Sequence, residues 1–232
     1  ELFKACFRLG WYGDVASLWH AMDSDDSGGT TLDELAAYEA RQLALFKKWA
    51  EQNYQGTKAC FNAIVRAARR LCRAQKDDLS PNHDPAAAKP RFGESSDRSA
   101  KVTLAEWETA LAHLGFPRDA AEVFNLLDWE DDGVISYLEL SFLSSWRPVA
   151  WLMAEPNHQA AEDFKRAMLE KYGHMVKAWR VSFDREGCGK ASWRDFCKAA
   201  GRLNVQGDRA GVWVVLDMHC VGFITLHEID PE

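Results

Sequence analysis

A twelve-residue acidic stretch near the start of the chain limits most strongly what this chain can fold into. It reads DSDDSGGTTLDE and covers residues 23–34. Five of its side chains are carboxylates, and they surround two adjacent glycines. Like charges this close together repel one another unless water or a bound cation offsets them. The spacing of the carboxylates decides between a solvated acidic loop and a cation site.

The spacing favours a cation. If Asp23 is position 1, oxygen-bearing side chains recur at alternate positions and Glu34 falls at position 12. A hard cation such as calcium takes about six to eight oxygen ligands, which alternate residues of a tight loop can supply. Gly28 at position 6 permits the sharp turn that such a loop needs. We therefore expect residues 23–34 to form a metal-binding loop.

The same spacing occurs a second time. Residues 128–139 read DWEDDGVISYLE and place aspartate at position 1, glycine at position 6 and glutamate at position 12. Apolar residues with helical spacing precede both loops: Val15, Leu18, Trp19 and Met22 before the first, and Ala120, Val123, Phe124 and Leu127 before the second. Two matches with the same flanks are a much stronger signal than one.

A helix, a metal loop and a second helix in this order resemble the EF-hand, and we call one such unit a hand. The resemblance to calmodulin-like proteins covers nearly the whole chain except one linker and one insertion. It implies an all-α fold of paired EF-hand helix-loop-helix units in tandem, with short two-stranded pairings between the loops of a pair. It also implies a calcium-binding protein.

The resemblance assigns metal ligands to alternate positions of the two loops, with position 7 contributing its backbone carbonyl. In the first loop these are Asp23, Asp25, Ser27, Gly29, Thr31 and Glu34, and in the second they are Asp128, Glu130, Asp132, Val134, Ser136 and Glu139. Three residues depart from the usual pattern: Ser27 replaces the commoner acid, Thr30 occupies a usually apolar position, and Glu130 is longer than aspartate. We expect calcium at both loops.

Internal repeats extend the pattern along the chain. Segments 13–23, 118–128 and 207–217 align without a gap, and each has an aspartate nine residues before the first loop aspartate. A second alignment places Glu1, Glu106 and Asp195 at position 12 of earlier loops. Glu1 would then end a loop whose other residues are absent, and the chain stops four residues after Glu228. We therefore expect this chain to be an excerpt of a longer array.

The repeats also suggest domain boundaries. The expected order is the second half of an EF-hand pair at 1–45, with its first loop missing except Glu1; a second pair at 46–147; a proline-containing linker at 148–158; and a degenerate pair at 159–232. In the second pair the first loop is disrupted by an insertion at about 77–100. Val102 and Thr103 are still placed to pair with Ile135.

Loop 184–195, which reads DREGCGKASWRD, is expected to be a weak or empty metal site. Cys188 at position 5 is a poor ligand for a hard cation, and Asp195 at position 12 is one methylene too short for easy bidentate closure. A magnesium ion is the alternative to an empty loop. The doubtful ligands are Asp184, Glu186, Lys190, Ser192 and Asp195.

Loop 217–228, which reads DMHCVGFITLHE, lacks two of the expected oxygen ligands, because His219 and Val221 replace them. We expect it to fold and pair as a structural hand. A zinc site at His219, Cys220 and His227 is the less favoured alternative, since the ligand types suit zinc but the spacing matches no zinc pattern.

Segment 61–76, FNAIVRAARRLCRAQK, carries five basic residues and no acid, with its apolar residues on one helical face. One alternative is a helix of the kind that calmodulin-like proteins bind, which would dock intramolecularly in a neighbouring hand pair or on an acidic partner. The favoured alternative is the entering helix of the disrupted hand, with a solvated basic side.

Composition excludes several classes of protein. The formal net charge of −7 argues against binding to nucleic acid or to an anionic membrane surface. No apolar run approaches the roughly 18 residues of a membrane span, and the N-terminus does not read as a signal peptide. Six cysteines without a CxxC pattern favour reduced thiols. We expect a cytoplasmic protein, with association to the cytoskeleton as an alternative.

The expected function is a calcium-responsive regulatory or adaptor module that binds a protein or peptide helix, because calcium can reorient the helices of a hand and expose an apolar groove. The histidines show neither a triad spacing nor an HExxH pattern, so no enzyme is expected. One alternative is a structural scaffold with constitutive or no calcium. Another is the regulatory segment of a larger enzyme or channel.

Overall fold

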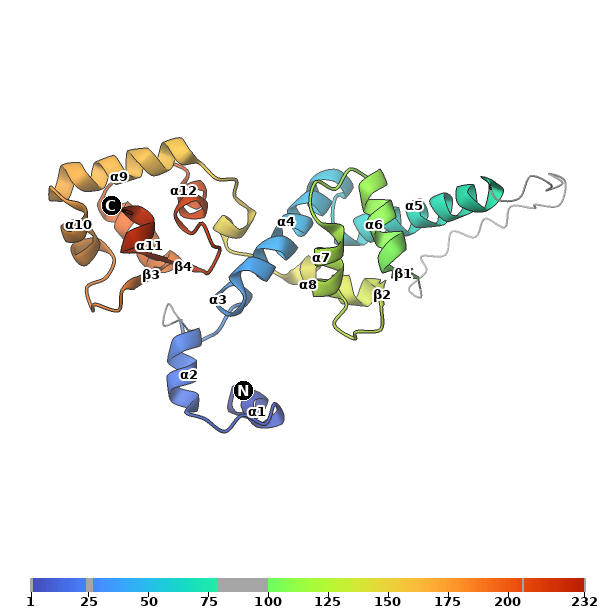
Figure 1. Cartoon of the computed structure of the whole chain (residues 1–232), viewed down its shortest axis with the longest axis horizontal. Coiled ribbons are helices and arrows are strands. Elements are labelled where there is room, and N and C mark those ends of the chain that lie inside the picture. The colour runs from blue at the N-terminus through green and yellow to red at the C-terminus, as the bar shows by residue number, and fades with distance from the viewer. Residues whose placement is uncertain (1, 24–26, 79–99, 206, 232) are drawn as a thin grey trace. The chain divides into compact units, whose positions relative to one another are not determined.

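The computed structural model of the chain describes residues 2–23, 27–78, 100–205 and 207–231 (Figure 1). The chain is mostly helical and its strands are short, which agrees with the all-α expectation. Its contacts divide it into two compact units, one of Gln42–Arg147 and one that joins Glu1–Arg41 to Pro148–Glu232. None of the described helices is both long and apolar enough to cross a membrane.

The unit Gln42–Arg147 contains most of α4 and the elements that follow it. In chain order these are α4 (Ala37–Tyr54), α5 (Thr57–Asp78), β1 (Lys101–Thr103), α6 (Leu104–His113), α7 (Ala120–Leu127), β2 (Val134–Ser136) and α8 (Tyr137–Ser145). Helix α5 packs against α6 and α8, and α6 packs against α7 (Figure 1). Segment 46–54, which the repeat suggested as the helix that opens this unit, is the second half of α4.

The aspartate that recurs in the repeats is a helix N-cap. The Asp119 carboxylate accepts hydrogen bonds from the backbone N–H groups of Ala121 and Glu122 and so starts α7. Asp14 and Asp208 cap α2 and α12 in the same way. An aspartate at this position satisfies N–H groups that have no partner within the helix. The repeated aspartate therefore sets where each helix before a loop begins.

Aromatic side chains fill the core of this unit. Trp107 is fully buried; its ring centroid lies 5.6 Å from that of Phe46 and 6.2 Å from that of Phe124. The indole Nε1 donates to the carbonyl of Ala120 at 2.9 Å, so its one polar group is satisfied. This packing fixes α6 against α4 and the start of α7, and the apolar stripe predicted for α7 is buried at Val123, Phe124 and Leu127.

Strands β1 and β2 form an antiparallel pair in which Val102 lies opposite Ile135. The prediction that these residues pair is confirmed. Both side chains are buried, so the ladder is held by packing as well as by backbone hydrogen bonds. Most of the predicted insertion at about 77–100 lies outside the described residues.

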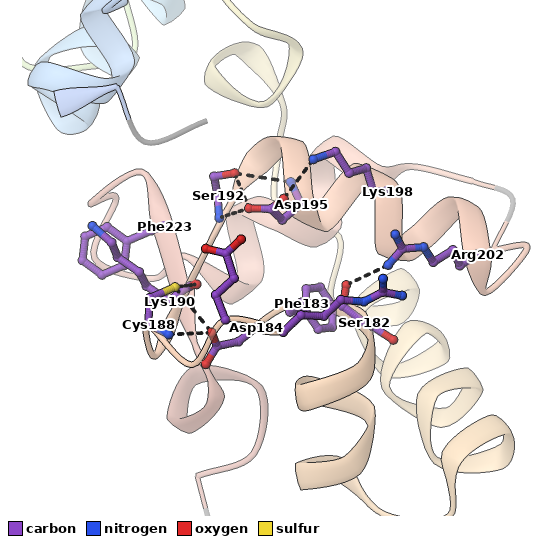
Figure 2. Close-up of a pocket in the computed structure, with 12 residues that line it drawn as sticks. Ser182, Phe183, Asp184, Cys188, Lys190, Ser192, Asp195, Lys198, Arg202 and Phe223 are labelled. Carbon is purple, nitrogen blue, oxygen red and sulfur yellow. Dashed lines mark hydrogen bonds and ion pairs between the residues drawn. The ribbon is translucent and has the colours of Figure 1, made fainter. Parts of the chain in front are cut away.

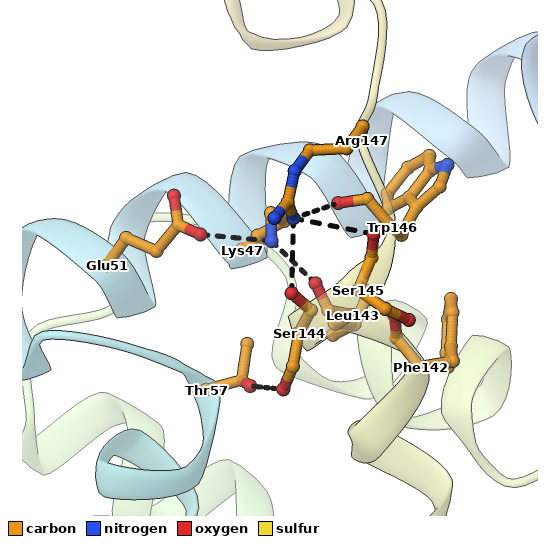
Figure 3. A network of polar contacts seen from close by, with 9 residues as sticks. All are labelled: Lys47, Glu51, Thr57, Phe142, Leu143, Ser144, Ser145, Trp146 and Arg147. Carbon is orange, nitrogen blue, oxygen red and sulfur yellow. Dashed lines mark hydrogen bonds and ion pairs between the residues drawn. The ribbon is translucent and has the colours of Figure 1, made fainter.

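The end of α8 is held by cationic side chains (Figure 3). The buried Lys47 Nζ of α4 donates to the carbonyl of Leu143 at 2.5 Å and lies 2.9 Å from a carboxylate oxygen of Glu51. Arg147 donates to the carbonyls of the same helix end, including that of Ser144 at 3.2 Å. The last carbonyls of a helix lack partners within it and carry partial negative charge, which cations offset.

Helix α5 buries its apolar face in its own unit. Phe61, Ile64, Val65 and Ala68 are all at most 8% exposed, and the helix packs on α6 and α8. Four arginines on the opposite side are exposed: Arg66, Arg69, Arg70 and Arg73. This is the arrangement of an entering helix with a solvated basic side, which was the favoured alternative.

The second unit contains α1 (Leu2–Arg8), α2 (Val15–Met22), α3 (Leu32–Leu35), the start of α4, and the elements after Pro148. The latter are η1 (Ala150–Met153), α9 (His158–Tyr172), α10 (Met175–Ser182), β3 (Lys190–Ser192), α11 (Trp193–Arg202), α12 (Arg209–Leu216), β4 (Phe223–Thr225) and α13 (Leu226–Ile229). Strands β3 and β4 pair with Ala191 opposite Ile224, so the segments expected to pair, 184–195 and 217–228, do lie together.

Segment 148–158 is more than a connection. It contains η1, which packs on α12, and its Trp151 is 1% exposed with its ring 6.1 Å from that of Trp213. Trp213 in turn lies 5.4 Å from Phe196, which is also fully buried. The segment that was expected to be a linker thus contributes a core side chain to its unit.

The described residues at 2–23 and 27–41 differ from the rest of this unit in burial. The apolar stripe predicted for α2 (Val15, Leu18, Trp19 and Met22) is only half-buried. A break at Ala36 separates α3 from α4. Arg41 then donates to the carbonyls of Trp151 and Ala154 at 2.8 and 2.9 Å, which attaches the start of α4 to the η1 segment.

The buried position of Trp151 leads to a stability prediction. Replacing Trp151 by alanine should lower the free energy of unfolding of its unit by about 3–5 kcal/mol, since it removes a large core side chain and leaves a cavity. Urea denaturation followed by far-UV circular dichroism measures this. Met218→Ala is the control in the same unit, because Met218 is 73% exposed. Equal effects of the two substitutions would contradict the core role of segment 148–158.

Candidate metal centre

The four acidic loops, at 23–34, 128–139, 184–195 and 217–228, share one backbone turn. Each has glycine at position 6 with a positive φ: Gly28 at 82°, Gly133 at 74°, Gly189 at 79° and Gly222 at 83°. Side chains with a Cβ adopt this region at a cost, so glycine is the residue that makes the turn easily. The expected role of glycine at this position is confirmed.

The aspartate at position 1 ties each loop together. Asp128 accepts hydrogen bonds from the backbone N–H groups of Asp132 at 3.2 Å and Gly133 at 2.9 Å. Asp23, Asp184 and Asp217 accept from positions 5 and 6 of their own loops in the same way. The loops therefore hold their shape through the chain's own donors.

The acid at position 12 caps the helix that follows the loop. One oxygen of Glu139, Oε2, accepts hydrogen bonds from the backbone N–H and the hydroxyl of Ser136 at 2.7 and 3.0 Å. The pairs Thr31–Glu34, Ser192–Asp195 and Thr225–Glu228 form the same capping box. These residues thus have a capping role besides the predicted metal-binding one, and Ser or Thr three residues before an acid is a capping signal that the sequence carries.

Loop 128–139 brings three carboxylates together. In the part of the chain that the structure describes, Asp128, Asp132 and Glu139 are the one group of three such side chains whose ligand atoms all lie within 4.8 Å of one another. Glu139 is 4% exposed, and its Oε1 has no hydrogen-bond partner among the described residues. A buried carboxylate oxygen without a partner is costly, so the arrangement fits a cation.

Lys101 of β1 lies next to this group. Its Nζ is 2.6 Å from Oδ2 of Asp132, and the side chains are 53% and 35% exposed. The hydrogen bond from Lys101 is the main cause of a lowered pKa of Asp132, and the same bond raises the pKa of Lys101. The contact between Lys101 and Asp132 forms across the strand pair, so local sequence spacing does not reveal it.

The other predicted ligands of this loop lie outside the group. Glu130 is exposed, and Ser136 is bonded to Glu139. The backbone N–H of Val134 donates to Oδ1 of Asp132 at 3.1 Å, which orients that carboxylate. The structure thus brings together three of the five predicted side-chain ligands and leaves Glu130 outside this group.

In loop 23–34 the predicted ligand Asp25 lies outside the described residues. Asp23 is 5% exposed and accepts from Ser27 and Gly28, while the Ser27 hydroxyl donates to the carbonyl of Gly29 at 2.9 Å. Glu34 is bonded to Thr31 in the capping box. The described ligands of this loop are therefore bonded to one another.

Loop 184–195 lines a pocket of about 310 Å³ (Figure 2). The buried Asp184 accepts hydrogen bonds from the N–H groups of Gly187, Cys188 and Gly189 and from the indole of Trp179. Burial by itself raises the pKa of Asp184, but the hydrogen bonds from Gly189, Cys188 and Trp179 outweigh it and leave the pKa lowered.

Cationic side chains offset two of the three acids of that loop, and the third, Glu186, is exposed. Arg180 lies 3.6 Å from Asp184, and Lys198 lies 3.2 Å from Asp195. Cys188 directs its thiol to Asp184 and to the carbonyl of Lys190. Since Asp184 and Asp195 already have partners within the protein, the charge available to a metal in this loop is reduced.

Loop 217–228 has one buried acid, Asp217, whose pKa is raised by burial despite hydrogen bonds from Val221 and Gly222. His219 and His227 are exposed. Within the described residues they form no metal-binding group with Cys220, so the zinc alternative gains no support there. All six cysteines are free thiols.

No protein-family model matches the chain, and no curated protein matches it.

The hydrogen bonds to Asp184 predict a pH-dependent loss of stability. Asp184→Asn should lower the free energy of unfolding by about 1–3 kcal/mol at pH 7, because it removes a charged acceptor for buried donors. The folded pKa of Asp184 is below its ordinary value of about 4, so this stabilisation is present above pH 4 and is lost as pH falls below it.

Denaturation of wild type and Asp184→Asn at a series of pH values from about 7 to about 3 tests this prediction. The difference in free energy of unfolding between the two proteins should decrease as the pH falls. The control is Asp163→Asn, whose carboxylate is 49% exposed. If the difference in free energy of unfolding between wild type and Asp184→Asn did not depend on pH, the assignment of the charged Asp184 carboxylate as the acceptor would be wrong.

Proposed function

We propose that the protein is a calcium-binding protein of the EF-hand type and that loop 128–139 is its working metal site. The observation that carries the proposal is Oε1 of Glu139, a buried carboxylate oxygen without a hydrogen-bond partner among the described residues, close to Asp128 and Asp132. The paired strands β1 and β2 and the shared loop turn support the EF-hand interpretation.

The ligand set favours calcium among the metals. Asp128, Asp132 and Glu139 offer carboxylate oxygens, and no sulfur or imidazole nitrogen belongs to the group. Hard cations prefer such oxygens, whereas zinc and copper favour imidazole and thiolate. Of the two common hard cations, calcium tolerates a flexible loop with uneven ligand geometry, while magnesium requires nearly ideal octahedral geometry.

The position of Glu139 supports a regulatory response. It lies in the first turn of α8, so a metal that binds Glu139 acts directly on the orientation of this helix. Leu138 and Phe142, four residues apart on α8, are 69% and 40% exposed. We propose that α8 is the element through which metal binding changes the surface offered to a protein or peptide partner.

Loops 23–34 and 184–195 are proposed to differ in metal binding. Loop 23–34 is proposed as a second calcium site, on the basis of its sequence spacing and shared turn. Loop 184–195 is proposed to bind magnesium weakly or to stay empty, since Arg180 and Lys198 offset two of its three acids, Asp184 and Asp195.

A structural scaffold is the second candidate function. Loops 184–195 and 217–228 are closed by hydrogen bonds from their own backbone and are paired through β3 and β4. Hands of this kind would serve as packing units without metal. This candidate applies best to the unit that contains Pro148–Glu232.

Calorimetric calcium titration of wild type and Glu139→Gln tests the calcium proposal. With about millimolar magnesium present, wild type should bind calcium with a Kd of roughly 10⁻⁷ to 10⁻⁵ M. Glu139→Gln should lose the site at 128–139, because an amide is a weaker ligand for a hard cation than a carboxylate.

Glu108→Gln is the matched control, since Glu108 is an exposed residue of α6 in the same unit and the substitution removes the same charge. Circular dichroism of each variant checks that the fold is retained. Calcium binding only at millimolar concentration, or an equal loss in both variants, would overturn the proposed site and favour the scaffold.

A further inference from the structure

Lys101 is placed by the strand pair and not by its own loop. It is the first residue of β1 and lies opposite Ser136 of β2. The buried pair Val102–Ile135 fixes this register, because a shift of one residue would turn both apolar side chains out of the core. The Lys101 side chain is thereby held beside loop 128–139.

The ammonium group of Lys101 has one direct contact in the metal centre. Nζ lies 2.6 Å from Oδ2 of Asp132, and Lys101 also interacts electrostatically with Glu130 and Glu139. Asp132 thus has a directly bonded cationic partner from the protein, whereas Oε1 of Glu139 has no hydrogen-bond partner among the described residues. The positive charge of Lys101 therefore contacts Asp132 directly, which is one of the three clustered carboxylates.

We propose that Lys101 is a built-in competitor for the metal at loop 128–139, whose ammonium must leave Asp132 before a divalent cation can use that carboxylate. This inference rests on the proposed function of the loop. It adds that calcium affinity is set in part by a residue of the partner strand. Affinity then rises whenever Lys101 is removed or held away from Asp132.

Electrostatics explains why the two cations exclude each other. A divalent ion among oxygens that lie within 4.8 Å of one another would be only a few ångströms from Nζ, and like charges at such distances repel. Lys101 is 53% exposed, so its flexible side chain can move into water when the metal enters. The competition therefore weakens binding without abolishing it.

The second strand pair supplies a natural comparison. Lys190 is the first residue of β3 and lies opposite Thr225 of β4, the same register as Lys101 and Ser136. Position 5 of the facing loop is Val221 instead of an aspartate, and the Lys190 Nζ lies over the Phe223 ring at 5.4 Å from its centroid. Equivalent lysines therefore differ in whether they meet a candidate metal ligand.

Calcium titration of the full chain with Lys101→Met, Lys101→Arg and Lys190→Met tests the proposal. Lys101→Met should lower the calcium Kd of the 128–139 site roughly tenfold, since it removes one like charge at close range. Lys101→Arg keeps the charge, and Lys190→Met removes a charge from a different loop pair. The calcium Kd of Lys101→Arg and of Lys190→Met should each stay within about twofold of the wild-type value, because neither substitution removes the positive charge beside Asp132.

Salt provides a second readout. Because a surface ion pair is screened by electrolyte, the difference in Kd between wild type and Lys101→Met should narrow between about 0.05 and about 0.5 M potassium chloride. A change in loop packing caused by the loss of the lysine would not depend on salt in this way. Circular dichroism confirms that the strand pair and helices are retained.

The outcomes separate this inference from the proposed function. If wild type and Lys101→Met bind calcium equally at 128–139 while Glu139→Gln loses that site, the metal site stands and the role of Lys101 is overturned. If Lys190→Met tightens binding as much as Lys101→Met, a general charge effect replaces the proposal. If neither wild type nor Lys101→Met binds calcium, the proposed function fails and this inference fails with it.

Discussion

The candidate metal centre depends on the pairing of β1 with β2. The buried contact of Val102 with Ile135 sets the register of the two strands, and the register places Lys101 beside Asp132. The same ladder leads directly into α8, whose first turn carries Glu139. A three-residue strand pair therefore positions both Glu139, a candidate ligand of loop 128–139, and the cationic Lys101 beside Asp132.

The loops show two ways of making crowded carboxylates tolerable. In loop 184–195 the protein supplies the compensation itself, through Arg180 at Asp184 and Lys198 at Asp195, together with several backbone donors. In loop 128–139 the compensation is incomplete, because Lys101 reaches Asp132 while Oε1 of Glu139 has no hydrogen-bond partner among the described residues. Loops with nearly the same backbone can thus differ in their need for a metal, and side chains from neighbouring elements make the difference.

The far end of α8 adds a mechanical constraint to this centre. Lys47 and Arg147 hold the last carbonyls of the helix, while Glu139 lies in its first turn (Figure 3). If a metal moved α8, the helix would therefore rotate about its held C-terminal end more readily than it would shift as a whole. The buried position of Lys47 makes this anchor stronger than an exposed ion pair, since its donors are not shared with water.

The sequence by itself determined the helical class, the twelve-residue loops with glycine at the turn, the pairing of Val102 with Ile135, and the acids that gather at 128–139. The helices, turns and acids follow from local spacing, since glycine, capping residues and apolar periodicity act over only a few residues, whereas the pairing of Val102 with Ile135 was predicted from the repeat of the hands along the chain. Only the tertiary structure decided that Glu130 lies apart from Asp128, Asp132 and Glu139, that Trp151 belongs to a core, and that Lys101 neutralises part of the site. The reason is that burial and charge pairing depend on which distant segments meet, such as β1 with β2 and η1 with α12, and no single segment carries that information.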